Sequence, residues 1–225
     1  MKRIALIPAR AGSKRIPGKN TRAFCGRPIV EYSLEAALLS DSCDVVVVST
    51  DDERVAEIAH DFGVLVIRRP SELADDMTPL IDVMTHTLEC VEADALCLIL
   101  ATAPFVTPEL VDEVFTKLMK SGDDGAMTIA SFPAPIQRAF LQKPDGTVQM
   151  MWPDQMLTRS QDLPEAMYDA GQLYWYQVPA LLTQKKGFLD RMTAVRVPRH
   201  RVQDIDTEED WMFAEAMYKA FDFSA

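Results

Sequence analysis

The sequence predicts a three-layer α/β protein built on a mostly parallel sheet, with a small inserted region. The main observation is that short apolar runs alternate with stretches of helical spacing through residue 131, as in right-handed βαβ units. The second is composition: a chain of 225 residues, 48% hydrophobic and 25% charged, can bury one large core without disulfides or metals. We therefore expect a single domain over residues 1–225.

The expected strands are short runs rich in β-branched and other apolar residues, as in a sheet covered on both faces. They lie at 4–8, 45–50, 64–67, 95–100 and 126–131. Between them, apolar residues recur at helical spacing. The expected helices lie at 28–40, 51–63, 78–91 and 107–122, with a last one from Thr207 or Glu208 to about Phe221.

Polar residues and a proline mark two of the helix starts. Asp51 and Asp52 come directly after an expected strand, and we expect both to serve the start of the following helix. Thr78 is the expected cap of the next helix, with Pro79 at its first position.

The alternation breaks between residues 132 and 177, where prolines and aromatic residues become frequent. Irregular stretches and hairpin pieces replace the strand–helix pattern, which resumes after residue 177. We expect 132–177 to be an inserted region that forms a substrate lid, a dimerisation arm or both.

Charge is distributed very unevenly along this acidic chain. The net charge is −11, yet the first thirty residues hold eight Lys and Arg and no Asp or Glu, which leaves −19 for the rest. An acidic body disfavours nucleic acid, whereas a local cationic site on it suits a small polyanion. The first apolar run is too short for a membrane span or a signal peptide, so we expect a cytoplasmic protein without membrane association. The four cysteines and three histidines show no zinc or redox spacing.

The cationic residues concentrate in the loop IPARAGSKRIPGKN, residues 7–20, at the end of the first expected strand. Ligands of such sheets bind at this edge. Five residues separate Gly12 from Gly18, and Asn20 follows the lysine, so the loop is neither a Walker A motif nor GxGxxG. Backbone N–H groups at Gly12 and Ser13 could approach phosphate oxygens, with Lys and Arg supplying charge. The alternative to phosphate binding is a basic loop that is simply solvated and has no ligand.

A pair of carboxylates stands near the other end of the chain. Asp204 and Asp206 are two residues apart, so on an extended segment both point the same way. Two carboxylates and a polyphosphate make a good Mg²⁺ site. The alternative is helix capping by Asp206 or Thr207, with 208–210 in the first turn, but capping leaves Asp204 without a role.

The loop resembles the nucleotide-binding signature of the acylneuraminate cytidylyltransferase family, the CMP-nonulosonic acid synthetases. The likeness continues through VVVSTDDERVAEIA, RRPSELADD, ATAPFVTPEL and VQDIDTEEDW, and so covers nearly the whole chain. The stretches PIQRAF and YDAGQLYW favour the branch that acts on pseudaminic acid. The resemblance implies a Rossmann-like nucleotidyltransferase sheet, a homodimer, and Mg²⁺-dependent transfer of CMP from CTP to an acidic nine-carbon sugar, with release of pyrophosphate.

The resemblance also implies the site residues. CTP is expected at Ala9, Arg10, Ala11, Ser13, Lys14, Lys19, Asn20 and Arg69, and the metal at Asp204 and Asp206. Within these sets, Arg10, Lys19 and Asp206 are expected to be catalytic. For the sugar we expect Gln137, Arg138, Arg159, Gln161, Asp169, Gln172 and Tyr174, with Arg138 or Arg159 on its carboxylate.

Other interpretations stay open at this point. The acceptor could be N-acetylneuraminic acid, legionaminic acid or Kdo, or the chain could be a nucleotidyltransferase for sugar 1-phosphates. A catalytically inactive nucleotide-binding module is the alternative of a different class. Nucleotide binding without turnover would distinguish it.

Overall fold

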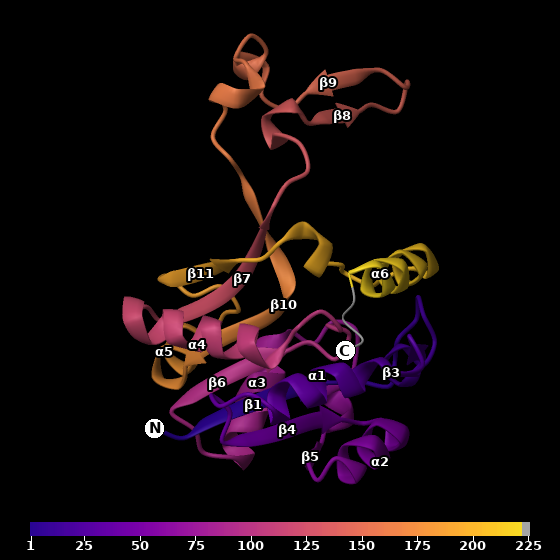
Figure 1. Ribbon diagram of the computed structural model, residues 1–225, viewed down its shortest axis with the longest axis vertical. Coiled ribbons are helices and arrows are strands. Elements are labelled where there is room, and N and C mark those ends of the chain that lie inside the picture. Colours follow the sequence, from indigo (N-terminus) through magenta and orange to yellow (C-terminus); the bar gives the residue numbers. More distant parts are fainter. Residues whose placement is uncertain (222–225) are drawn as a thin grey trace.

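A seven-stranded sheet in the order β11-β7-β10-β6-β1-β4-β5 forms the centre of the computed structural model, which describes residues 1–221 (Figure 1). The strands are β1 (Arg3–Pro8), β4 (Val45–Thr50), β5 (Leu65–Arg68), β6 (Ala95–Ile99), β7 (Gly125–Ser131), β10 (Met167–Gln177) and β11 (Met192–Arg196). Only β10 runs antiparallel to its two neighbours in this sheet. The expectation of a mostly parallel α/β sheet is therefore confirmed.

Helices cover both faces of the sheet. They are α1 (Ile29–Leu38), α2 (Glu53–Asp61), α3 (Leu80–Cys90), α4 (Pro108–Ser121), α5 (Val178–Gln184) and α6 (Glu208–Ala220). Residues from α1, α2 and α4 share one buried cluster with one face of the strands. Met84 of α3 and Leu181 of α5 share a second cluster with the other face. Alternate side chains of β1 illustrate the division, because Ile7 joins the first cluster and Leu6 the second.

A third buried cluster ties the basic loop to the C-terminal helix. It contains Ile16 of the loop, Phe24 of the hairpin β2 (Ala23–Phe24)/β3 (Arg27–Pro28), Ile205, and Trp211 of α6. The rings of Phe24 and Trp211 meet edge to face at 5.7 Å between centroids. Apolar packing thus holds the basic loop against the segment around Ile205 and α6 at one edge of the sheet.

The range 132–177 divides into two parts. Residues 132–166 project from the sheet as an arm that carries the hairpin β8 (Phe140–Gln142)/β9 (Val148–Met150) (Figure 1). Residues 167–177 instead form β10, which lies between β6 and β7. Its second half is buried on both faces and its first half holds Asp, Gly and Gln, so neither half shows the alternation by which a strand is recognised.

The helix starts follow the expected capping only in part: Asp51 does not serve the start of α2, and Pro79 is at the N-cap of α3 and not at its first position. Asp52 caps α2 by accepting a hydrogen bond from the Arg54 N–H, as expected. Thr78 does not cap α3, which begins at Leu80. The Asp75 carboxylate accepts from both the Thr78 N–H and the Thr78 hydroxyl, each at 2.7 Å, and so draws Thr78 into the preceding turn.

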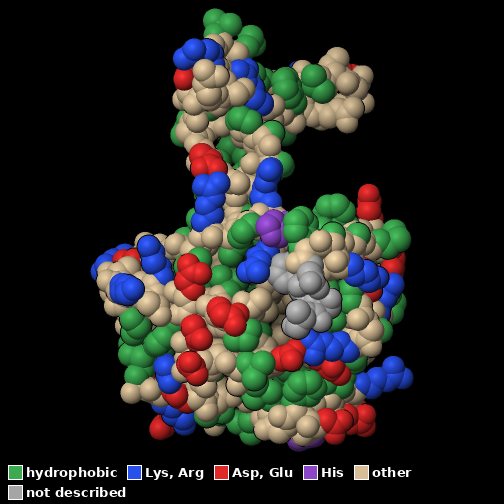
Figure 2. All heavy atoms as spheres, viewed as in Figure 1, with side chains coloured by type: hydrophobic (Ala, Val, Ile, Leu, Met, Phe, Trp, Pro, Cys, Tyr) green, Lys and Arg blue, Asp and Glu red, His purple; other side chains and the backbone are tan. Residues whose placement is uncertain are grey.

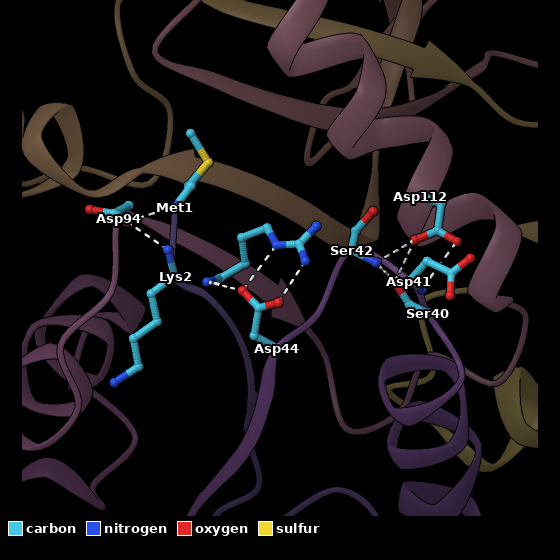
Figure 3. A network of polar contacts seen from close by, with 9 residues as sticks. Met1, Lys2, Ser40, Asp41, Ser42, Asp44, Asp94 and Asp112 are labelled. Carbon is cyan, nitrogen blue, oxygen red and sulfur yellow. Dashed lines mark hydrogen bonds and ion pairs between the residues drawn. The ribbon is translucent and has the colours of Figure 1, made fainter.

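Hydrogen bonds to the carboxylates of Asp44 and Asp112 lie at the edge of the sheet where its parallel strands begin, opposite the basic loop (Figure 3). Asp44 accepts hydrogen bonds from the Arg3 backbone N–H at 2.8 Å and from its guanidinium at 2.6 and 3.0 Å. These bonds hold the pKa of Asp44 at about 2. Asp112 accepts from the Ser40 hydroxyl at 2.6 Å and from the Ser42 N–H at 2.9 Å. These contacts anchor β1, β4 and α4 far from the candidate site.

Short 3₁₀ turns join several elements. They are η1 (Lys19–Thr21), η2 (Ser71–Leu73), η3 (Ile136–Arg138), η4 (Pro153–Gln155), η5 (Ser160–Asp162) and η6 (Arg199–Arg201). Within residues 1–221, no helix is both long enough and apolar enough to cross a membrane.

Candidate active site

The carboxyl ends of the parallel strands bring three sequence-distant segments together. Pro8 at the end of β1 pairs with Ser49, and Thr50 at the end of β4 pairs with Arg68. The basic loop, Asp51 and Arg69 therefore leave the sheet at the same edge. This is where parallel α/β sheets bind their ligands.

The end of β4 shapes the basic loop. The Ala9 N–H donates to the Ser49 carbonyl at 3.0 Å, and the Thr50 hydroxyl donates to the Ala9 carbonyl at 2.5 Å. Asn20, only 7% exposed, donates from its amide to the Arg10 carbonyl at 3.0 Å. Asn20 thus reaches the loop backbone and fixes its course.

Asp51 has a role that the sequence interpretation missed. Its carboxylate accepts a hydrogen bond from the Ala11 N–H at 2.9 Å, whereas the expected helix start belongs to Asp52 alone. The sequence did hold a signal for this role, because one acidic residue is enough to cap a helix and two adjacent ones stand here. The Ser13 N–H is also engaged, since it donates to the Ala11 carbonyl at 2.9 Å. In this conformation that N–H group bonds within the loop, and its expected approach to phosphate stays a prediction.

The loop cations form two groups around two carboxylates. Arg10 and Lys14 both pair with Asp76, the former at 2.5 Å. The hydrogen bond from Lys14, and then that from Arg10, hold the pKa of Asp76 below its usual value. Arg15 pairs with Asp206 at 2.8 Å, and the Lys19 ammonium lies 3.6 Å from the same carboxylate. The cations in each half of the loop are thus neutralised by one carboxylate, Asp76 or Asp206. A ligand with more negative charge could replace that carboxylate.

Lys19 also joins the basic loop to the segment that precedes α6. Its ammonium donates to the Ile205 carbonyl at 2.6 Å, and its side chain is 19% exposed. The side chain of Lys14, in contrast, is 82% exposed. The two lysines therefore differ in burial: Lys19 is a largely buried cation bonded to the backbone, and Lys14 is a solvent-exposed cation paired with Asp76.

Arg69 is buried, whereas its neighbour Arg68 points to solvent. The Arg69 guanidinium donates to the Ser49 hydroxyl at 3.2 Å and to the Ser49 carbonyl at 2.7 Å. Burial lowers the pKa of Arg69. Arg68 forms a two-pronged ion pair with Glu53 on the surface. Of the two arginines, only Arg69 lies on the side of the loop.

The acidic pair lies on the segment between η6 and α6. Ile205 between the two aspartates is fully buried in the third cluster, so the flanking side chains leave the opposite side of the extended segment. Thr207 caps α6 through a capping box with Asp210, so the cap is not Asp206. Desolvation by the surrounding chain, and then the charge of Asp206, raise the pKa of Asp204. Within residues 1–221, no cluster of three or more His, Cys, Asp or Glu is placed to hold a metal.

The expected sugar residues fall into two places. Asp169, Gln172 and Tyr174 lie in β10, where Leu173 pairs with Ile99 near the edge that carries the loop. The other four, Gln137, Arg138, Arg159 and Gln161, lie on the arm.

The arm residues make local contacts there. Arg138 donates to the Met156 and Thr158 carbonyls at 2.8 and 2.5 Å, and Arg159 pairs with Asp162 at 2.6 Å. The structure brings the three β10 residues to the sheet edge and leaves the arm residues apart from it.

A cationic loop at the carboxyl edge of a mostly parallel sheet is typical of α/β proteins that bind anionic ligands at this edge. Comparison with known proteins is more specific. The cytidylyltransferase family model matches residues 4–208, and the chain belongs to that family.

Named relatives agree with this assignment. A pseudaminic acid cytidylyltransferase of Campylobacter jejuni is 36% identical, in an alignment that covers 97% of this chain and 97% of that one. A CMP-N,N'-diacetyllegionaminic acid synthase of Legionella pneumophila is 28% identical over 96% of each chain. A solved CMP:2-keto-3-deoxy-manno-octonic acid synthetase in complex with CTP shares the fold, with a TM-score of 0.72, 19% identity and coverage of 98% of this chain and 100% of that one. The resemblance stated from the motifs is thus confirmed.

Proposed function

We propose that this cytidylyltransferase transfers CMP from CTP to the anomeric hydroxyl of a nonulosonic acid, and that pseudaminic acid is its preferred acceptor. The observation that carries the proposal is the meeting of Arg15 and Lys19 with Asp206 at the carboxyl edge of the sheet. The choice of acceptor rests on the relatives, since the Campylobacter jejuni protein named for pseudaminic acid matches over nearly the full length.

CTP would bind by replacing the carboxylates that now neutralise the loop. Its triphosphate carries more charge than Asp76 and can take over Arg10 and Lys14. Lys19 already lies beside the acidic pair and needs no large movement to reach an α-phosphate placed there. Ala9 and Ala11 would flank the base, and Arg69 would lie near it with its guanidinium oriented by Ser49.

Asp204 and Asp206 would hold Mg²⁺ together with phosphate oxygens. The donor set fits this ion, because Mg²⁺ in proteins is commonly bound by one or two carboxylates plus substrate phosphates. The extended segment presents both carboxylates on the side opposite the buried Ile205. When bound, the ion would neutralise phosphate charge and lower the pKa of a coordinated hydroxyl.

The reaction needs positioning more than covalent help from side chains. The acceptor oxygen attacks the α-phosphorus, the bond to pyrophosphate breaks, and the hydroxyl proton is released. Arg10 and Lys19 are placed to stabilise charge that grows on the phosphate oxygens and the leaving group. The short contact of Lys19 with Ile205 keeps its ammonium oriented throughout.

We also propose a homodimer formed through the arm. The arm exposes large apolar side chains, including Phe140, Leu141 and Val148, and Leu157 is 93% exposed (Figure 2). Such a patch is typical of a surface covered by a partner. Since CTP is a cytoplasmic metabolite, we place the reaction in the cytoplasm.

Pyrophosphate release tests the proposal directly. The protein is mixed with CTP and Mg²⁺ and, in parallel, with pseudaminic, legionaminic and N-acetylneuraminic acids and Kdo. Fastest release with pseudaminic acid supports both parts of the proposal. Fastest release with another acid keeps the reaction and replaces the acceptor. CTP binding without release from any of them refutes the proposal and favours the inactive binding module.

A further inference from the structure

Strand β10 contains a large irregularity beside the candidate site. Asp169 pairs with Ile129 of β7, but the next paired residue, Tyr174, lies opposite Met127. The intervening residues of β10 bulge out, and Gly171 allows this with a φ of +64°.

The Asp169 side chain stabilises the bulge. Its carboxylate accepts from the Gly171 N–H at 3.0 Å and from the Tyr174 hydroxyl at 2.7 Å. Bulges next to active sites commonly redirect a side chain.

Gln172 lies inside this bulge and is almost fully buried, at 4% exposure. Its carbonyl accepts from the Leu100 N–H at 3.1 Å, which places it beside the first residue after β6. Its side-chain nitrogen is buried and has no hydrogen-bond partner within residues 1–221. Buried polar groups in native proteins are nearly always hydrogen-bonded, so an orphaned amide beside an active site calls for a ligand.

The bulge lies at the edge of the sheet where β6 ends, because Leu173 pairs with Ile99 and the Gln172 carbonyl bonds to the residue that follows it. Gln172 and Tyr174 are two residues apart on a strand, so their side chains leave the same face of the sheet. Burial and the hydrogen bond to Asp169 raise the pKa of Tyr174, and the charge of Asp204 contributes to the rise. Gln172 and Tyr174 thus share one face of β10 at the edge of the sheet where β6 ends.

We propose that Gln172 is a specificity residue of the acceptor subsite, where its amide donates a hydrogen bond to the carbonyl oxygen of an N-acyl group on the sugar. This inference rests on the proposed function. The rings of Tyr174 and Tyr176 stack at 6.2 Å between centroids, and the Tyr174 side chain leaves the same face of β10 as that of Gln172. An aromatic, largely dry wall disfavours a carboxylate, which would lose its hydration. An acylamino group offers a neutral acceptor and a methyl group that packs on the rings.

The test uses Gln172→Met, which keeps the size of the side chain and removes the amide. Gln177→Met is the matched control, because Gln177 is in the same strand and its amide already donates to the Asp123 carbonyl at 2.7 Å. Kinetics are measured with CTP and Mg²⁺ on the full chain, with pseudaminic acid as the varied substrate. Thermal unfolding of both variants is measured without ligand.

Gln172→Met is expected to raise the KM for pseudaminic acid on the order of tenfold, with the KM for CTP unchanged and no loss of thermal stability, because an unpartnered donor is removed. Gln177→Met is expected to lower the unfolding temperature and leave the sugar KM unchanged. A sugar KM within twofold of wild type overturns the inference. So does a loss of stability in Gln172→Met that matches the control, because the amide would then have a structural partner. If the wild-type protein itself releases no pyrophosphate, the proposed function fails and this inference fails with it.

Discussion

Replacement of Lys19 by alanine should damage both the fold and the reaction, whereas replacement of Lys14 should affect CTP binding alone. Both lysines lie in the basic loop and are expected to contact phosphate. They differ in their surroundings, since the Lys19 side chain is 19% exposed and that of Lys14 is 82% exposed. Lys19 also joins the loop to Ile205 through a 2.6 Å hydrogen bond.

The size of the effect follows from these contacts. A hydrogen bond to a charged group contributes about 1.5–3 kcal/mol. At about 2–4 °C per kcal/mol for a chain of this length, Lys19→Ala should lower the unfolding temperature by roughly 3–12 °C. The loss of a preoriented cation at the developing charge should lower kcat/KM by about 10²–10³. Lys14→Ala should leave the unfolding temperature unchanged, because exposed ion pairs contribute little, and should raise the KM for CTP.

The assays are differential scanning fluorimetry of the ligand-free variants and pyrophosphate release at varied CTP. If both variants unfold at the wild-type temperature, the bridge from Lys19 to Ile205 does not stabilise the fold. If Lys19→Ala keeps wild-type kinetics, the assignment of Lys19 to the phosphates is wrong.

Three further predictions concern other parts of the molecule. Asp206→Ala should reduce kcat by at least about 10² while CTP still binds in calorimetry, because the carboxylate is assigned to the metal and not to the nucleotide; wild-type kcat would remove that role. The Arg3 contacts lower the pKa of Asp44 from 3.8 to about 2, so they stabilise the fold above pH 3.8 and are lost as the pH falls towards 2. In urea unfolding, the stability difference between wild type and Asp44→Asn should therefore be constant above that range and shrink below it, and a difference that is independent of pH would contradict the assignment. Leu157→Glu should convert the proposed dimer to a monomer in light scattering, whereas Met77→Glu, at another highly exposed apolar residue (85%) outside the arm, should not; a dimer that persists in both would exclude Leu157 from the interface.

The local features of this protein were readable before its structure. Strand and helix periodicity is a property of neighbouring residues, so the alternating elements through β7 and the last helix were found within a few residues of their bounds. The basic loop and the acidic pair were also visible, because both are clusters of like charge close together in the chain. The family followed from the same stretches.

Pairing between distant segments was decided only by the tertiary structure. The central place of β10 depends on strand partners that lie far from it in sequence, and its bulge hides the periodicity. The bond of Asp51 to Ala11, the neutralisation of Arg10 by Asp76 and the orphaned amide of Gln172 likewise depend on which segments meet in space. The sequence by itself indicated a cationic site and a carboxylate pair, because clusters of charge are local, and the expected chemistry followed from the resemblance to a family. The tertiary structure determined which partner each side chain has, because long-range contacts form only when the sheet brings its strand ends to a common edge.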